Sequence, residues 1–387
     1  MNKLIRADLH VHVGATAAGQ MVKISASPDL TLHGIKAAAA WKGLQVVGVV
    51  DCHVPALQEE LAGLVANGEL TVPGGGGFRW RDGTLFLPAV EVETREGPQG
   101  RPMHSLVFLP DLTALQAFTD WLRTRVSNIH LSSQYCRAAL AEVWQTSLFW
   151  GGFLIPAHIF TPHRGMYAAV NGLRQLLDAD APAGVPAVEL GLSADSELAD
   201  GLPELANLTF VSNSDAHSPL SMGREYNLIR LEDVSFAGVR EALQKGGVLA
   251  NFGLDPRLGK YYRSYCRHCQ RLLTGSPPQL HCLCGRDDKL VVGVLDRIAT
   301  LAKGSASTGR PPYYHRVPLP MVPGIGAATL KKMVMAFGSE LAAAEADYEQ
   351  LARVVGERLA EVICLARSGQ GRFVSGGGGQ YGRLLQG

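Results

Sequence analysis

Residues 8 to 12 read Asp8-Leu9-His10-Val11-His12 and end a short apolar run that starts at Leu4. Alternate side chains of a β-strand point to the same face, so His10 and His12 can bind one metal ion together. A His-x-His at a strand end also occurs by chance, and the pair alone leaves a metal-binding and a purely structural role equally open. The other histidines and carboxylates of the chain decide between these roles.

Further imidazoles and carboxylates stand beside other short apolar runs. Histidines of a protein core are usually solitary, so this repetition favours a metal site. Asp51-Cys52-His53 leaves open whether Asp51, His53 or both bind metal, and we expect Asp8 to orient the histidines instead. The predicted ligands are His10, His12, Asp51, His53, Glu91, His104, His158, Asp215 and His217.

The ligand types predict the chemistry. Imidazoles with carboxylates and no thiolate suit Zn, Mn, Mg or Fe, and the set is larger than one ion needs, so we expect two or three divalent ions. Paired ions can generate hydroxide and stabilise the charge of an attacked phosphate. We expect phosphoester hydrolysis, with Asp215, Glu91 and His158 as catalytic residues and Asp215 as a bridging or activating carboxylate.

Short apolar runs alternate with helical stretches from residue 4 to about 254. Strands separated by helices imply parallel βαβ units, and six or seven of them suggest an α/β barrel. Most of the predicted ligands follow the carboxyl ends of these runs, which is where such barrels place their active sites.

The length of 387 residues predicts two or three domains, and the 18% of charged residues favours a well-buried core. We expect a catalytic domain at 1–254, a zinc-binding basic domain at 255–303 and a helical DNA-binding domain at 304–387 that ends in a flexible Gly-rich tail. Residues 255 to 316 hold eleven Lys and Arg against four Asp. This excess makes the segment a candidate surface for an anionic ligand, although a solvated basic linker is the alternative.

Four cysteines lie within residues 266 to 284 as Cys266-Arg267-His268-Cys269 and His281-Cys282-Leu283-Cys284. This is the two-knuckle spacing of a small zinc ribbon, so we expect one structural zinc whose fourth ligand, His281 or Cys282, stays open. Basic and aromatic residues around the knuckles suit contacts with DNA, and packing around the zinc is their alternative role. They are Arg263, Arg267, Arg271, Tyr261 and Tyr262.

Pro323-Gly324-Ile325-Gly326 precedes a helical pattern from Ala327 to Phe337. The arrangement is similar to a helix-hairpin-helix, in which Gly324 and Gly326 would let hairpin amides approach a DNA phosphate. Helical packing without DNA contact is the alternative. No apolar run approaches the length of a membrane span and the start lacks a signal-peptide pattern, so we expect a cytoplasmic, nucleoid-associated protein without membrane contact.

The histidine and carboxylate pattern resembles the PHP (polymerase and histidinol phosphatase) family over residues 4 to about 230, which implies a distorted (β/α)7 barrel. Residues 14 to 19 lack the acidic residue that the family usually has after His-x-His. A closer resemblance is to the endonuclease Q branch, and it covers nearly the whole chain. It is carried by residues 189–195 and 211–219, by Ala157-His158 with Phe160-Thr161-Pro162, and by the cysteine segment.

The endonuclease Q resemblance implies nicking of double-stranded DNA on the 5′ side of uracil, hypoxanthine, xanthine or an abasic site. A sliding clamp is a further candidate partner. Two alternatives remain: a small-molecule phosphatase of the histidinol phosphatase type, which leaves the cysteine segment and the hairpin without a purpose, and a DNA-binding scaffold with an inactive barrel.

Overall fold

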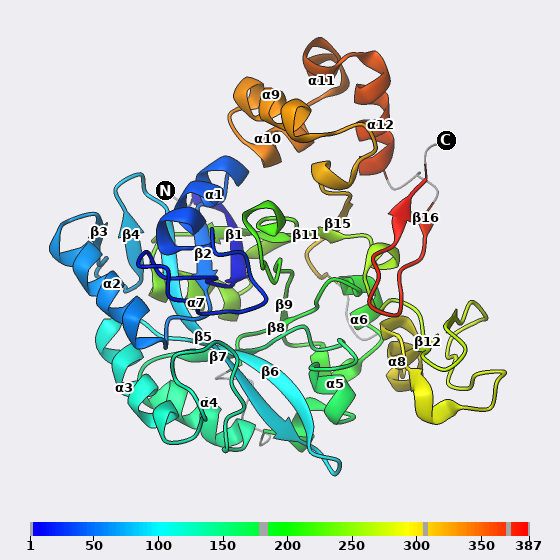
Figure 1. Cartoon of the computed structure of the whole chain (residues 1–387), viewed down its shortest axis with the longest axis horizontal. Coiled ribbons are helices and arrows are strands. Elements are labelled where there is room, and N and C mark those ends of the chain that lie inside the picture. The colour runs from blue at the N-terminus through cyan, green and yellow to red at the C-terminus, as the bar shows by residue number, and fades with distance from the viewer. Residues whose placement is uncertain (1–2, 178–184, 305–308, 369–372, 386–387) are drawn as a thin grey trace.

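Most of the strands that carry the predicted ligands form one mixed sheet in the computed structural model, which describes residues 3–177, 185–304, 309–368 and 373–385 (Figure 1). Its hydrogen-bonded order is β15-β11-β10-β1-β2-β5-β4-β3, and β6 joins β5 to β7. The strands are β1 (Lys3–Val11), β2 (Val46–Val49), β3 (Leu70–Thr71), β4 (Phe78–Trp80), β5 (Leu85–Glu96), β6 (Arg101–Phe108), β7 (Phe153–Pro156), β10 (Tyr226–Leu231), β11 (Val248–Leu254) and β15 (Tyr313–Arg316).

The strand directions confirm the expectation of parallel units only in part. β1, β2 and β5 run parallel, as do β8 (Ala187–Glu189) and β9 (Thr209–Val211). β6 is antiparallel to both β5 and β7, and β10 is antiparallel to β1 and β11. The short turn between Glu96 and Arg101 explains the first of these pairs, because a tight hairpin can only join antiparallel strands.

The β8–β9 pair lies between β7 and the β10–β11 edge. β7 contacts β8, and Asn251 of β11 donates a hydrogen bond to the Phe210 carbonyl of β9. Inward-facing side chains of the surrounding strands form a single apolar cluster that includes Leu9, Leu87 and Val211. The strands therefore enclose a packed interior, as in an α/β barrel.

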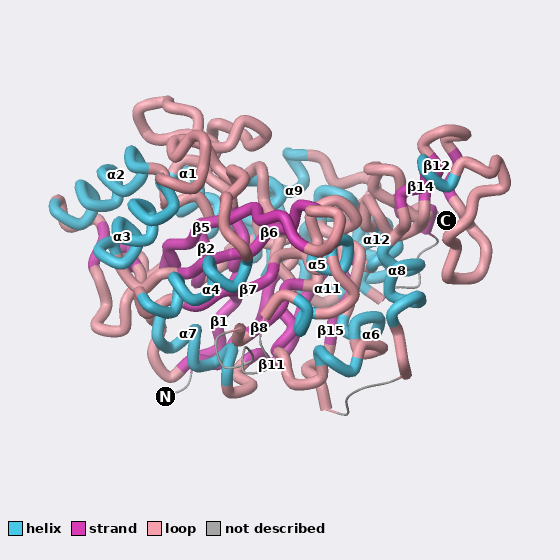
Figure 2. The backbone as a smooth tube through the Cα atoms, turned by 90° about the horizontal axis from the view of Figure 1, so that it is seen from below, coloured by secondary structure: helices cyan, strands magenta, loops and turns pink. Residues whose placement is uncertain are grey.

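Helices cover the outside of this sheet, and a second apolar cluster lies between the helices and the strands. Figure 2 shows α1 to α4 and α7 outside the strands. The helices of this part are α1 (Leu32–Lys42), α2 (Pro55–Ala66), α3 (Leu112–Arg123), α4 (Leu140–Phe149), α5 (Met166–Ala169), α6 (Ser196–Ala199) and α7 (Phe236–Gln244). Among the described residues, none of the helices has both the length and the apolar character needed to cross a membrane.

The cysteine segment follows β11 and forms a small three-stranded sheet of β13 (Arg271–Leu272), β12 (Tyr265–Cys266) and β14 (Leu290–Val291). α8 (Val294–Leu301) returns the chain towards the barrel. β15 then pairs in parallel with β11, so residues 313–316 join the barrel sheet although the sequence places them with the helical end.

The helical end has its own apolar core, which includes Leu319, Met333 and Ile363. The helix expected from Ala327 to Phe337 is confirmed as α9 (Ala327–Phe337), and only a single 3₁₀ turn, Leu319–Met321, precedes it. The remaining helices are α10 (Glu340–Glu345), α11 (Tyr348–Val355) and α12 (Glu357–Arg367). Gly356, with φ of 85°, joins α11 to α12, and a glycine, Gly326, likewise precedes α9.

Residues 373–385 of the Gly-rich tail contain regular secondary structure, and the flexibility expected of this tail stays a prediction. β16 (Phe373–Val374) and β17 (Arg383–Leu384) form a two-stranded ribbon. The ribbon lies beside the cysteine segment (Figure 1), where the Arg263 backbone N–H donates to the Gly376 carbonyl. A second chain segment thus supplies the hydrogen bonds that the Gly-rich sequence cannot make alone. Residues 369–372 and 386–387 lie outside the described part.

Candidate metal centre and its surroundings

Seven of the predicted ligands converge at one rim of the barrel. They form three overlapping groups, and within each group the candidate ligand atoms lie within 4.8 Å of one another. His12 belongs to two of the groups, and so does Glu91. They are His10, His12 and Glu91; His12, Asp215 and His217; and Glu91, His104 and His158.

The strands explain why these residues meet. His10 lies at the end of β1 and His12 directly follows this strand, His158 follows β7, and Asp215 and His217 follow β9. His104 lies in the first half of β6, yet reaches the same rim because β6 runs antiparallel to β5.

Two carboxylates lie between the imidazoles. Oδ1 of Asp215 is 3.5 Å from Nε2 of His10 and 3.4 Å from Nε2 of His12. Oε1 of Glu91 is 3.4 Å from Nε2 of His10, and Oε2 of Glu91 is 3.6 Å from Nε2 of His12. Each carboxylate therefore faces both histidines of the first motif, as bridging ligands would.

Several ring nitrogens at this rim have no hydrogen-bond partner. Nε2 of His10, Nε2 of His12 and Nδ1 of His158 are buried and unpaired. A buried polar atom without a partner is costly unless a ligand satisfies it. The Nε2 atoms of His10 and His12, beside two carboxylates, fit divalent cations, and the three groups offer places for two or three of them.

The charges also favour cations. Burial would raise the pKa of Asp215, but His10, His12 and His158 hold it well below its usual range. Burial acts in the same direction on Glu91, and His104 with Lys23 holds the pKa of that carboxyl well below its ordinary value. Both groups are therefore ionised and available as ligands.

Two residues of the centre have unusual backbone conformations. His158 has φ of 30° and Asp215 has φ of 47°. Such left-handed conformations are uncommon for residues other than glycine and cluster at functional sites, where surrounding structure holds them.

Glu189, at the end of β8, is a member of the site that the sequence prediction missed. Its carboxylate is 3.0 Å from Nδ1 of His10 and accepts hydrogen bonds from the His158 backbone N–H and from Asn213. It orients a ring whose other nitrogen faces the cluster. Its position at a strand end is the signal that could have identified it.

Asp51, His53 and Asp8 occupy supporting positions, and the ligand role predicted for the first two finds no support. Asp51 accepts from the Val13 backbone N–H at 2.8 Å and lies 2.9 Å from Nδ1 of His12, which holds its pKa down at about 2 against the effect of burial. His53 contacts the Leu131 carbonyl. Neither belongs to the three ligand groups. Asp8 binds the backbone N–H groups of Ser214 and Gly223, so it holds a loop and not a histidine ring.

Lys23 is a second member that the sequence analysis missed. Its Nζ lies 3.2 Å from Oε2 of Glu91 and 2.6 Å from Oγ of Ser133, which itself hydrogen-bonds Glu91. The side chain is 13% exposed. It places a fixed positive charge beside the cluster. Lys23 lies shortly after residues 14–19, the stretch after His-x-His that lacks an acidic residue.

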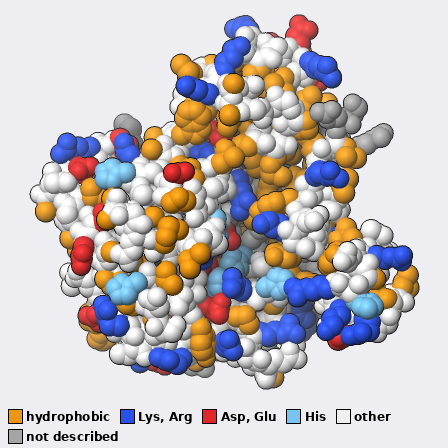
Figure 3. Space-filling model, in the orientation of Figure 1, with side chains coloured by type: hydrophobic (Ala, Val, Ile, Leu, Met, Phe, Trp, Pro, Cys, Tyr) orange, Lys and Arg blue, Asp and Glu red, His pale blue; other side chains and the backbone are white. Residues whose placement is uncertain are grey.

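A cavity of about 610 Å³ joins the ligand cluster to other parts of the chain. Lys23 and Arg164 line it from the barrel, and Lys260, Tyr261 and Tyr381 line it from beyond residue 254. Figure 3 shows Lys and Arg side chains around the cysteine segment and along a hollow that contains His side chains. Cationic side chains and aromatic rings therefore line the cavity that leads to the ligand cluster.

The other predicted DNA contacts have different surroundings. Arg263 is largely buried, donates to the Gly275 carbonyl and lies 3.7 Å from Asp296, so it packs within the cysteine segment. Tyr262 is half-buried, which raises its pKa. Arg271 is exposed, and Arg267 lines a second cavity with Arg101 and Arg297. Gly324, with φ of 92°, and Gly326, which caps α9, are exposed.

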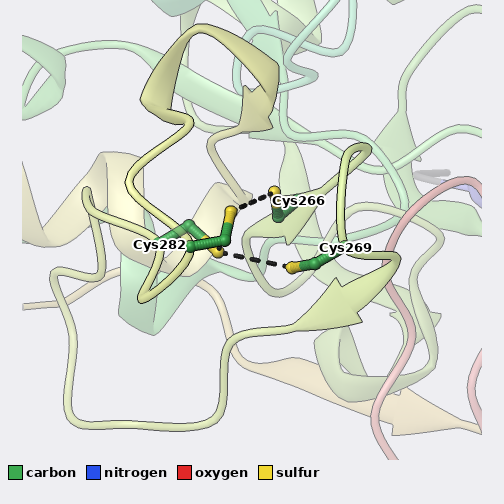
Figure 4. A group of neighbouring side chains, drawn as sticks. Cys266, Cys269 and Cys282 are labelled. Carbon is green, nitrogen blue, oxygen red and sulfur yellow. Dashed lines mark hydrogen bonds between the residues drawn. The ribbon is translucent and has the colours of Figure 1, made fainter.

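The four cysteines form a second candidate metal site. The Sγ atoms of Cys266, Cys269, Cys282 and Cys284 lie within 4.8 Å of one another. Figure 4 shows the first three directed towards a common centre. Backbone N–H groups of Cys269 and His268 lower the pKa of Cys266 to about 7. His281 instead lies 2.7 Å from Asp287 and is 84% exposed, so the geometry favours Cys282 over His281 as the fourth ligand.

The α/β fold thus brings together a rim of imidazoles and carboxylates that could hold divalent metal ions. No protein-family model matches the sequence. The uncharacterized protein YqxK of Bacillus subtilis is 40% identical over 391 residues and covers 99% of both chains. The crystal structure of the lesion-specific endonuclease PfuEndoQ from Pyrococcus furiosus is 30% identical and superimposes with a TM-score of 0.83 over 99% of this chain and 95% of that one.

A second solved structure, an endonuclease Q complex with a 27-mer duplex that has an abasic lesion at the active site, is 30% identical and superimposes with a TM-score of 0.85. It covers 100% of this chain and 97% of that one. The chain therefore belongs to the endonuclease Q family, whose members are nucleases that act on DNA.

Proposed function

We propose that the chain is a metal-dependent endodeoxyribonuclease that nicks the strand on the 5′ side of a deaminated base or an abasic site. The observation that carries this proposal is the shared cavity. It joins the ligand cluster to Lys260, Tyr261 and Tyr381, which lie outside the barrel. A phosphatase for small molecules does not need cations and aromatic rings from outside the barrel around its cavity. A DNA strand presents phosphates to such cations and bases to such rings.

The candidate ligands are the seven residues of the three groups. When bound, two or three divalent ions would polarise the phosphate and supply hydroxide. Zn, Mn, Mg and Fe all suit the imidazole and carboxylate donors. Cys266, Cys269, Cys282 and Cys284 would hold the second metal, a zinc ion. Its role would be structural, because a tetrahedral site made of four thiolates is closed and leaves no position for a substrate.

The protein groups divide the remaining work. Asp215 and Glu91 stay ionised and would hold the cations, while Glu189 orients the His10 ring. Lys23, Arg164 and Lys260 face the cavity and would attract the phosphates. A target base must leave the stack to be read, since pairing hides its deaminated edge.

We propose that the three parts of the chain share this task. The barrel of residues 1–254 cuts, the basic segment of residues 255–303 holds the strand at the cavity, and the helical end of residues 304–387 binds the flanking duplex through Gly324 and Gly326. Among the side chains predicted to contact DNA, Arg271 is exposed and Arg267 and Tyr261 each line a cavity, which supports this assignment. A sliding-clamp partner stays a prediction from the resemblance.

A nicking assay with defined duplexes tests the proposal. Duplexes that carry one uracil, hypoxanthine, xanthine or abasic site are incubated with protein and Mg²⁺, Mn²⁺ or Zn²⁺, and the product ends are mapped against an undamaged duplex. We expect cleavage 5′ of the lesion only. Turnover of histidinol phosphate without any nick would contradict the proposal and support the phosphatase alternative.

Asp215→Asn is the matched variant for this assay. Asn tolerates the left-handed backbone at this position, so the change removes charge without forcing the loop to move. We expect the variant to bind the damaged duplex and to lose nicking by about 100- to 1000-fold, as removal of a principal electrostatic group does. Asp120→Asn, at an exposed position of α3, serves as control and should cut normally.

A further inference from the structure

The C-terminal ribbon reaches the candidate metal centre. Tyr381, in the connection between β16 and β17, lines the same cavity as His12, His158 and Asp215. The Lys260 Nζ lies 4.6 Å from the centre of the Tyr381 ring. A segment near the end of the chain thus contributes to a site that is otherwise built from residues 1–261.

Close backbone packing determines where the ribbon lies. The backbone N–H groups of Gly376, Gly379 and Gly382 donate to the carbonyls of Arg257, Lys260 and Leu258 at 2.8, 3.1 and 2.9 Å. A Cβ atom at Gly376 would lie 2.2 Å from the Gly259 carbonyl oxygen, and one at Gly382 would lie 2.5 Å from that of Val374. Glycine is therefore required at both places, and the ribbon presents Tyr381 in a defined position.

A chain of hydrogen bonds connects Tyr381 to Asp215. Nη1 of Arg224 donates to the Tyr381 hydroxyl at 2.7 Å. Nε and Nη2 of Arg224 donate to the Ser214 carbonyl at 3.0 and 2.7 Å. Ser214 directly precedes Asp215, whose φ of 47° needs support from its surroundings.

We propose that Tyr381 is a positioning residue of the active site that acts on Asp215 through Arg224. Its hydroxyl accepts a hydrogen bond from Nη1 of Arg224, which keeps Nε and Nη2 directed at the Ser214 carbonyl. Arg224 also lines the cavity. Without the Tyr381 hydroxyl, a DNA phosphate would compete for the guanidinium, and Arg224 would release the Ser214 carbonyl. The inference rests on the proposed nuclease function, because it assigns Tyr381 a part in that reaction.

Tyr381→Phe tests the proposal, because it keeps the ring beside Lys260 and removes only the acceptor. Supporting residues around a metal site typically change affinity or activity by about 10- to 100-fold. We expect kcat for nicking an abasic duplex to fall by about that factor while KM stays unchanged. Tyr348→Phe, at an exposed tyrosine of α11, is the matched control and should behave as the wild type.

Mn²⁺ affinity of the barrel gives a second readout that does not depend on nicking. Thiolate sites select zinc and not manganese, so Mn²⁺ binding reports on the histidine and carboxylate cluster of a protein that holds zinc at the cysteine site only. We expect Tyr381→Phe to weaken Mn²⁺ binding. Arg224→Lys should weaken it as well, and the double variant should be no weaker than Arg224→Lys alone, because Tyr381 acts through Arg224.

Unchanged kcat and Mn²⁺ affinity in Tyr381→Phe would overturn the proposal. A rise of KM alone would also overturn it, because it would indicate direct DNA contact in place of positioning. If the wild-type protein does not nick damaged duplexes, the proposed function fails, and the Mn²⁺ measurements still decide whether Tyr381 supports the centre.

Discussion

Oε2 of Glu189 lies 3.0 Å from Nδ1 of His10, and the opposite nitrogen of the same ring, Nε2, is buried and makes no hydrogen bond to the described residues. The two residues are 179 positions apart and come from different strands. A carboxylate on one side of an imidazole fixes its tautomer and orientation, so that the other nitrogen can bind a metal ion. Glu189 is therefore the support of the first ligand motif.

Glu189→Ala should weaken Mn²⁺ binding by about 10- to 100-fold and lower nicking with it, because His10 loses the group that orients its ring. Mn²⁺ titration of protein that holds zinc only at the cysteine site measures the first effect. Glu197→Ala, at an exposed position of α6, is the control. Equal Mn²⁺ affinity in the wild type and in Glu189→Ala would show that the ring needs no such support.

Replacement of single residues in the cysteine segment should separate the two candidates for its fourth zinc ligand. The Sγ atoms of Cys269 and Cys282 are 3.5 Å apart, whereas His281 is turned to Asp287. We expect Cys282→Ser to lose the zinc and His281→Ala to keep it. Metal analysis of the purified variants measures this directly, and zinc loss in His281→Ala alone would reverse the assignment.

Glu340→Ala should destabilise the protein by about 3 kcal/mol, since it leaves the buried ammonium of Lys42 without its partner. The two groups are 2.8 Å apart, with side chains 6% and 2% exposed, and they join α10 to α1. Burial lowers the pKa of Lys42. Urea denaturation measures the loss. Glu241→Ala, which breaks the exposed pair with Lys245, should have a much smaller effect, and equal losses would contradict the prediction.

The pH dependence of stability should report on Glu225. Burial raises the pKa of Glu225 from its ordinary value of 4.5 to about 8. Between these values the folded protein keeps a proton that the unfolded chain has lost. The free energy of unfolding therefore falls as the pH rises, by at most about 1.4 kcal/mol per pH unit from this group.

Glu225→Gln removes this dependence because the amide is neutral throughout. We expect the stability of the variant relative to the wild type to increase as the pH rises between about 5 and about 8. Urea denaturation at a series of pH values measures the difference, with Glu232→Gln at an exposed position as control. A difference that is constant with pH would show that Glu225 is ionised in the folded protein.

Residue types in and beside the predicted strands were sufficient to propose most of the candidate ligand cluster. His10, His12, Glu91, His104, His158, Asp215 and His217 all converge as expected. The same reasoning left open whether Asp51, His53 or both bind metal, and in the structure the carboxylate of Asp51 turns to Nδ1 of His12. A strand-end carboxylate can reach a metal or a neighbouring imidazole, and only side-chain packing distinguishes the two.

Contacts between distant segments account for what the sequence did not predict. The roles of Glu189, Lys23 and Tyr381 depend on strands and loops that are remote in the chain. The Gly-rich tail has no local signal for order, and its ribbon forms because Arg257, Leu258 and Lys260 offer backbone carbonyls. The antiparallel pairings of β6 and β10 likewise depend on which strands become neighbours.

The sequence by itself determined the donor atoms of both candidate metal sites, because the chemistry and spacing of histidines, carboxylates and cysteines are local properties of the chain. The tertiary structure decided which donors face one another, which support a neighbour, and that the C-terminal ribbon reaches the metal-binding rim. The reason is physical: alternation along a strand determines the face on which a side chain lies, but its partner depends on strand direction, register and packing.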